Sequence, residues 1–201
     1  MNLMREYIRA LLTEAAKKPR DLPAGVYIVI DPHGNRGAAI HYADEDGDGI
    51  VATQDGPWGE IYIVDIAGHY MDSPCGKAWK VSSANAGSGW GPMLYDVAME
   101  YATVMGGGLI ADRDAVSKDA RTVWNYYLSR RSDVKIHQLD DLKNTLTPEE
   151  EDNCDQNVAT YTTGYPSTNT ADWTKSPLSK RYTKEMSTMN ALIALDKLVE
   201  L

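Results

Sequence analysis

Three alternating glycines followed by a proline constrain the fold of this chain more than any other feature. Gly87, Gly89 and Gly91 stand directly before Pro92. Proline suits the first position of a helix, where its missing N–H would have no partner. Apolar residues then recur at helical spacing, at Leu94, Val97, Ala98, Tyr101 and Met105. The pattern predicts a tight turn that opens a helix over 92–105, and its glycines let backbone approach closely.

What approaches this turn is either a ligand or another part of the protein. Backbone N–H groups at a helix start, together with the helix dipole, form an anion site that suits a pyrophosphate. The stretch lacks the lysine of a P-loop, and Pro92 occupies the third glycine position of a dinucleotide fingerprint. The alternative is a strand-to-helix turn that needs glycine only for tight packing.

Hydrophobic periodicity predicts an α+β (mixed α/β) fold with a central, mostly antiparallel sheet. The expected elements are a helix over 2–17, strands over 25–31, 37–43, 59–66 and 77–82, the helix over 92–105, a strand over 106–112 and a helix over 117–131. Ser117 is the expected N-cap of that last helix. We expect residues 1–134 to form one domain.

The remaining residues, 135–201, are expected to form a helical and irregular appendage packed on that domain. Thr147 and Glu150 have the spacing of a capping box, which predicts a helix start. Residues 160–177 are polar and rich in turn formers, which indicates an irregular loop. The chain then ends in a predicted helix with Leu192, Leu195 and Val199 on one face.

The glycine turn and its flanks resemble motif A of the GNAT superfamily of acyl-CoA N-acyltransferases. In that motif a strand leads through a G-x-G-x-G turn into an amphipathic helix. Val81 falls on the family's valine, and Gly87, Gly89, Trp90 and Gly91 fall on its turn. The resemblance covers about residues 25–131, and 123–134 and 176–184 also resemble bacteriophage-encoded GNAT-like proteins.

This resemblance implies a site for acetyl-CoA or another acyl-CoA. Backbone N–H groups of residues 87–91 would hold the CoA pyrophosphate, while the strand around 81–83 would pair with pantetheine and polarise the thioester carbonyl. The implied cofactor-binding residues are Val81, Ser82, Ser83, Gly87, Ser88, Gly89, Trp90 and Gly91.

Catalysis would further need a group that removes a proton from the acceptor amine. Asp65, His69 and Asp112 lie near the ends of predicted central strands and are the candidates. Tyr126 or Tyr127 would protonate the departing thiolate. The implied function is N-acyltransfer to an amine of a small molecule or protein.

Several positions depart from the family pattern. Ala86 stands where the family has arginine or glutamine, and Ser83 and Asn85 replace a proline and an aromatic residue. Trp124 stands where the family has the tyrosine that protonates the departing thiolate, and an indole cannot act as a general acid. The alternative function is therefore a non-catalytic, GNAT-shaped phage structural or host-interaction protein.

An acidic stretch over 44–55 has the ligand spacing of a calcium loop. Asp44, Asp46 and Asp48 occupy positions one, three and five, and Asp55 occupies position twelve. The flanks read as strands rather than the helices of an EF-hand. A solvated acidic loop between strands is the alternative.

Charge and cysteine content narrow the partners and the compartment. The net charge of -9 disfavours binding to nucleic acid, although 179–184 is a candidate for a local basic patch. Cys75 and Cys154 lack metal-ligand and redox-pair spacing, which indicates free thiols in a reducing cytosol. No apolar run approaches a membrane span, and the charged start predicts no signal peptide. We expect a cytoplasmic protein, in the host if phage-encoded; virion association and a homodimer stay open.

Overall fold

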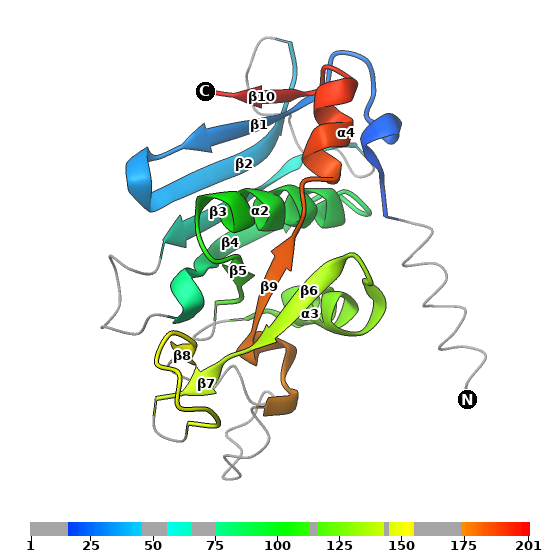
Figure 1. Ribbon diagram of the computed structural model, residues 1–201. Coiled ribbons are helices and arrows are strands. Elements are labelled where there is room, and N and C mark those ends of the chain that lie inside the picture. Colours follow the sequence, from blue (N-terminus) through cyan, green and yellow to red (C-terminus); the bar gives the residue numbers. More distant parts are fainter. Residues whose placement is uncertain (1–15, 46–55, 66–74, 113–115, 143–144, 155–173) are drawn as a thin grey trace, which may run out of the picture.

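The computed structural model describes residues 16–45, 56–65, 75–112, 116–142, 145–154 and 174–201, and these form a mixed α+β fold around one large sheet (Figure 1). Its strand order is β10–β1–β2–β3–β4–β5–β9–β6. The strands are β1 (Tyr27–Pro32), β2 (Gly37–Ala43), β3 (Gly59–Asp65), β4 (Trp79–Ala86), β5 (Leu109–Ile110), β6 (Val134–Gln138), β9 (Lys180–Lys184) and β10 (Leu198–Glu200).

Most neighbouring strands of this sheet are antiparallel. β1 to β4 form an antiparallel meander, and β9 is antiparallel to both β5 and β6. Two pairs are parallel: β4 with β5, and β1 with the C-terminal strand β10. The predicted α+β class with a mostly antiparallel sheet is thereby confirmed at the level of architecture.

Helix α2 (Gly91–Met105) lies across the sheet and contacts β2, β3, β4, β5 and β9 (Figure 1). Its Val97, Ala98 and Met99 are fully buried in the same apolar cluster as Ile40 and Ile61 of the sheet. Leu94, Val97, Ala98 and Tyr101 of the predicted apolar stripe are thus buried, whereas Met105 at the end of the helix is 54% exposed.

Helix α3 (Lys118–Arg130) follows β5 and carries an aromatic cluster. Ser117 caps it as predicted, because its hydroxyl accepts the Ala120 N–H at 3.1 Å. Trp124 lies 5.0 Å from Tyr182 of β9 and 5.7 Å from Tyr95 of α2, measured between ring centroids. Trp124 is 1% exposed, so this residue is part of the core that joins both helices to the sheet.

The C-terminal third takes part in the sheet rather than lying on it as an appendage. Residues after 134 supply most of β6 and all of β9 and β10, and β10 pairs with β1 near the opposite edge. Helix α4 (Thr188–Ala194) is shorter than predicted, because Asp196 adopts a φ of 54° and turns the chain into β10. Leu195 and Val199 are consequently exposed, while Leu192 is buried as expected.

One further sequence expectation is corrected after β6. Thr147 does not begin a helix; its N–H instead donates to Asp140 Oδ2 at 2.8 Å, as does that of Leu146 at 2.7 Å. Asp140 thus holds this loop through two main-chain hydrogen bonds. It belongs to a small sheet of β7 (Asp140–Asp141) and β8 (Asn153–Cys154).

The two cysteines form a disulfide, contrary to the expectation of free thiols. Cys75 lies in the turn η4 (Cys75–Lys77) before β4, and Cys154 ends β8. The two cysteines are 79 residues apart in the sequence, so their pairing could not be predicted from local spacing and depends on the tertiary fold. Across the described residues, no helix has the length and apolar character needed to cross a membrane.

Candidate functional site

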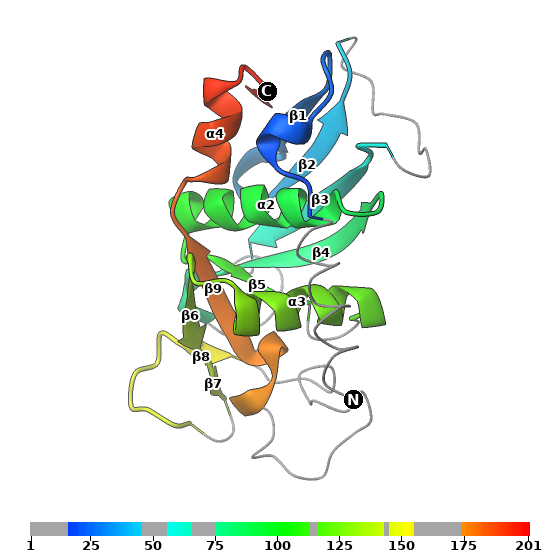
Figure 2. The same ribbon diagram turned by 90° about the vertical axis from the view of Figure 1, so that its right-hand side faces the viewer.

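A cavity of about 480 Å³ opens beside the glycine turn. Its walls come from the second half of β4, the start of β3, and the first turns of both α2 and α3, which flank β4 in Figure 2. The lining residues are Ala16, Glu60, Ile61, Ala84, Asn85, Ala86, Gly87, Ser88, Gly89, Gly91, Pro92, Leu94, Tyr95, Ser117, Asp119, Ala120, Thr122 and Val123. This volume lies within the range of small-molecule sites.

One edge of β4 is open along this cavity. β4 pairs with β3 as far as Ala86, but it pairs with β5 only at Trp79 and Lys80. Beyond Lys80, no strand in the described part of the chain covers that edge. The four residues 82–85 are accordingly exposed, although they lie in the middle of the strand order. An unpaired strand edge offers main-chain N–H and C=O groups to an extended ligand.

A β-bulge lies where this edge becomes free. Tyr62 pairs with Ser83 and Ile63 pairs with Val81, so Ser82 is the extra residue of β4. A bulge bends its strand and locally increases the twist. This bend coincides with the position at which β4 and β5 cease to pair.

The three glycines of the turn differ in how far the structure requires a glycine. Gly89 has a φ of +80°, which few residues with a side chain adopt. A Cβ on Gly87 would lie 2.6 Å from the Gly56 carbonyl oxygen, so this glycine permits close packing. A Cβ on Gly91 would meet only the Ala86 Cβ, at 3.6 Å, which is an ordinary contact. Only Gly91 is therefore free of a steric or conformational requirement.

Part of the turn is engaged internally and part faces the cavity. The Gly87 N–H donates to the Trp58 carbonyl at 2.9 Å, and the Trp90 N–H donates to the Gly87 carbonyl at 3.0 Å. Within the described residues, the N–H groups of Ser88 and Gly89 have no hydrogen-bond partner. Gly91 begins α2, so its N–H belongs to the first turn, which has no acceptor inside the helix.

The N-termini of two helices line the same cavity. Gly91 and Pro92 come from the first turn of α2, and Asp119 and Ala120 come from that of α3. Each helix N-terminus carries about half a positive charge from the aligned peptide dipoles. The geometry therefore favours an anionic group between the two helices.

The side chains around the cavity are apolar or uncharged apart from two carboxylates. Glu60 of β3, which pairs with Asn85 of β4, and Asp119 of α3 are both exposed. Tyr95 also lines the cavity, and burial raises the pKa of its hydroxyl to about 12. Tyr95 therefore stays neutral at physiological pH and can donate a hydrogen bond. Sequence reasoning missed it because it lies beside the predicted buried stripe of α2 rather than on it.

The predicted cofactor-binding residues fall into two groups. Gly87, Ser88, Gly89 and Gly91 line the cavity. Ser82 and Ser83 lie on the exposed edge of β4, just beyond the lining.

Val81 and Trp90 instead belong to the core, with 6% and 4% exposure. The Trp90 ring packs edge-on against Tyr42, whose hydroxyl donates to the Trp90 carbonyl at 2.8 Å. The Trp90 side chain thus anchors the turn to the hydrophobic core.

The proposed acid–base carboxylates do not meet at the cavity. Asp65 ends β3 opposite Trp79, six residues from the Gly59 end of the strand, or about 20 Å at the rise of a strand. Asp112 forms an ion pair with Lys80 at 3.7 Å, beyond β5. Neither lines the cavity. His69 lies outside the described residues.

The two tyrosines proposed as acids also lie away from the cavity. Tyr127 is fully buried, and its hydroxyl donates to Asp96 Oδ1 at 2.7 Å while lying 3.2 Å from the Pro92 carbonyl oxygen. Burial, and then the Asp96 charge, hold its pKa well above the ordinary value. Tyr126 is half-buried beside Arg131. Neither residue lines the cavity, although Tyr127 braces the first turn of α2.

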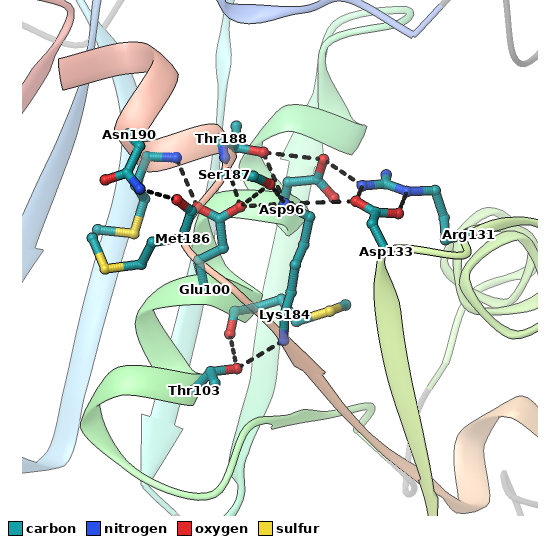
Figure 3. Close-up of polar contacts among 12 residues, drawn as sticks. Asp96, Glu100, Thr103, Arg131, Asp133, Lys184, Met186, Ser187, Thr188 and Asn190 are labelled. Carbon is teal, nitrogen blue, oxygen red and sulfur yellow. Dashed lines mark hydrogen bonds and ion pairs between the residues drawn. The ribbon is translucent and has the colours of Figure 1, made fainter. Parts of the chain in front are cut away.

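A buried charge cluster lies on the side of α2 next to α4 (Figure 3). Glu100 receives the Lys184 ammonium and the N–H groups of Thr188 and Met189, each of these N–H contacts at 2.7 Å. Both Glu100 and Lys184 are nearly inaccessible to water. These contacts tie the start of α4 and the end of β9 to the middle of α2.

Arg131 continues this cluster toward α3. Its guanidinium binds Asp96 at 3.0 Å and chelates the Asp133 carboxylate through two contacts of 2.7 Å (Figure 3). The hydrogen bonds from Arg131 hold the pKa of Asp133 below its ordinary value, whereas burial raises the pKa of Asp96.

The predicted basic patch at 179–184 is largely a strand, β9, in which Lys180 and Lys184 are buried.

The predicted calcium ligands are mostly outside the described residues. Asp44 directly follows β2, while Asp46, Asp48 and Asp55 lie in 46–55. Across the part of the chain that is described, no group of three or more His, Cys, Asp or Glu side chains is arranged to hold a metal ion.

Comparison with known proteins identifies no relative: no protein-family model matches the chain, and neither a curated protein nor a solved structure does.

Proposed function

We propose that this protein is an N-acyltransferase that transfers the acetyl group of acetyl-CoA to an amine. One observation carries the proposal: the cavity joins an open strand edge, a glycine turn and two helix N-termini in one place. The order of elements around it (a strand, the turn, a helix, a short strand and a second helix) is the order expected from the GNAT resemblance.

The cavity offers complementary groups to the two parts of CoA. The N–H groups of Ser88, Gly89 and Gly91, backed by the dipole of α2, suit the pyrophosphate. The free edge of β4 from Ser82 to Asn85 suits the amide-bearing pantetheine arm, which can hydrogen-bond to main chain as a neighbouring strand would.

This reaction requires no covalent nucleophile on the protein. The amine nitrogen attacks the thioester carbonyl carbon, the C–S bond breaks, the nitrogen loses a proton and the thiolate gains one. Glu60 and Asp119 are the carboxylates at the cavity that could accept the amine proton. Tyr95 is the neutral hydroxyl there that could stabilise the departing sulfur by hydrogen bonding.

Calorimetric titration with acetyl-CoA tests the proposal, and Gly91 is the position to vary. Gly91→Asp places a carboxylate at the first position of α2, where it suits the helix but repels a phosphate. We expect the wild type to bind, Gly91→Ala to bind within about threefold, and Gly91→Asp to lose at least tenfold in affinity, about 1.4 kcal/mol. Equal affinity of the two variants, or no binding by a folded wild type, contradicts the proposal.

A second candidate function is an acyl-CoA-binding or partner-binding protein without catalysis. It is favoured by the burial of Trp124 and Tyr127 and by the distance of Asp65 from the cavity. Release of free thiol from acetyl-CoA in the presence of polyamines or lysine peptides separates the two functions. Binding without amine-dependent thiol release supports the non-catalytic protein.

A further inference from the structure

We propose that Lys17 binds a phosphate group of the ligand at the glycine turn, so that residues 16–18, directly before η1 (Pro19–Asp21), complete the site. The inference rests on the proposed function, since it concerns the same cavity. It assigns the ligand to phosphorylated nucleotide thioesters rather than to shorter pantetheine thioesters.

The backbone of Lys17 is fixed to the turn. Its N–H donates to the Gly89 carbonyl at 3.0 Å, and the preceding Ala16 lines the cavity. Gly89 is the residue whose positive φ shapes the turn. A segment distant in sequence is therefore held against the atoms proposed to face the pyrophosphate.

The side chain of Lys17 reaches the aromatic ring of the residue that precedes α2. Its ammonium is 5.7 Å from the centroid of the Trp90 ring, and Trp90 directly precedes the first residue of the helix. The side chain is exposed, and within the described residues no carboxylate forms an ion pair with it. A long, solvated and unpaired ammonium can turn toward an anion at small cost.

The charge balance of the cavity calls for such a cation. None of the described residues that line it is lysine or arginine, whereas Glu60 and Asp119 are acidic. The chain as a whole carries a net charge of -9. Helix dipoles alone would have to offset these carboxylates before a phosphate could bind, and an ammonium on Lys17, the residue after Ala16 of the lining, would add a full positive charge.

The neighbouring cations and anions do not alter this assignment. Lys18 and Arg20 are exposed in the same segment, and the Lys18 N–H donates to Asp21 Oδ2 at 2.8 Å. Asp21 therefore caps the Lys18 main chain, and it forms no ion pair with Lys17. Among the described cations, Lys17 is the one joined to the turn by both a main-chain and a ring contact.

Lys17→Gln tests the proposal because it removes the charge but keeps the main-chain hydrogen bond to Gly89. Lys17→Arg keeps the charge, and Lys135→Gln removes a charge from the edge strand β6, outside the cavity lining. Each protein is titrated with acetyl-CoA, acetyl-pantetheine and inorganic pyrophosphate, at low and at raised salt.

We expect Lys17→Gln to weaken acetyl-CoA and pyrophosphate binding about threefold to tenfold, and to reduce the salt dependence of both. Acetyl-pantetheine binding should be unchanged, Lys17→Arg should restore affinity, and Lys135→Gln should match the wild type. Unchanged acetyl-CoA affinity in Lys17→Gln overturns the assignment while leaving the proposed function intact.

Failure of the proposed function gives a different result. Binding of pyrophosphate through Lys17 without binding of acetyl-CoA supports the phosphate site and contradicts the acyl-CoA function. Absence of binding by every probe to a folded wild type overturns both.

Discussion

At the scale of single residues, the structure shows which glycines of the turn are needed for packing or backbone conformation. Gly87 is needed because Gly56 and Trp58 approach it closely, and Gly89 because of its positive φ. Gly91 meets neither requirement, and it stands at the helix start that lines the cavity. A structural explanation therefore covers Gly87 and Gly89, and neither packing nor backbone conformation requires a glycine at position 91.

Alanine substitution separates these roles. Gly87→Ala should lower the free energy of unfolding by about 1–3 kcal/mol, because its Cβ would overlap the Gly56 carbonyl oxygen and the Trp58 ring. Gly91→Ala should leave stability within about 0.5 kcal/mol or raise it, since alanine favours the helix. Urea unfolding measures both, and equal destabilisation by the two changes would contradict the packing assigned to Gly87.

Sequence reasoning recognised the turn residues but not the side chains that complete the site. Gly87, Ser88, Gly89 and Gly91 follow from a local pattern, and all line the cavity. Tyr95, Glu60 and Lys17 could not be found in this way. Their proximity depends on the register between β3 and β4 and on a main-chain contact across more than seventy residues.

At the scale of elements, the buried pair of Glu100 and Lys184 joins α2 to β9 and α4. Glu100 accepts both the ammonium and two N–H groups at the start of α4, where a negative charge also complements the helix dipole. Removal of one partner leaves the other charge buried without compensation.

Lys184→Met should therefore cost about 3–5 kcal/mol of unfolding free energy. Lys135→Met is the matched control, because Lys135 pairs with Glu185 on the surface, where both side chains are mostly exposed, and such pairs contribute at most about 1 kcal/mol. Denaturant unfolding of the two variants provides the comparison. A loss at Lys184 no larger than that at Lys135 would mean that the buried pair does not hold α4.

Elements with strong local signals were predicted well, and those defined by distant contacts were not. β2, α2 and α3 lie within a residue or so of their expected bounds, because their periodicity and the Ser117 cap are local. β9 reads as a basic run because three of its five residues are cationic, yet its alternate residues are buried. Its place between β5 and β6 comes from tertiary pairing that no local pattern encodes.

At the scale of the whole molecule, β4 and β5 are paired at one end of β4 and are not paired at its other end. β4 and β5 pair at Trp79 and Lys80, near the turn that the Cys75–Cys154 disulfide connects to β8. At the opposite end of β4 the edge is free, and the cavity forms between the two helices that follow β4 and β5. We propose that this opening binds an acyl-CoA.

The most direct measurement is the change in backbone amide chemical shifts of the ¹⁵N-labelled protein on addition of acetyl-CoA. We expect the largest changes at Ser88, Gly89 and Gly91, with smaller changes along 82–85 and at 117–120. Shifts confined to other parts of the molecule, or no shifts in a well-dispersed spectrum, would contradict the proposal.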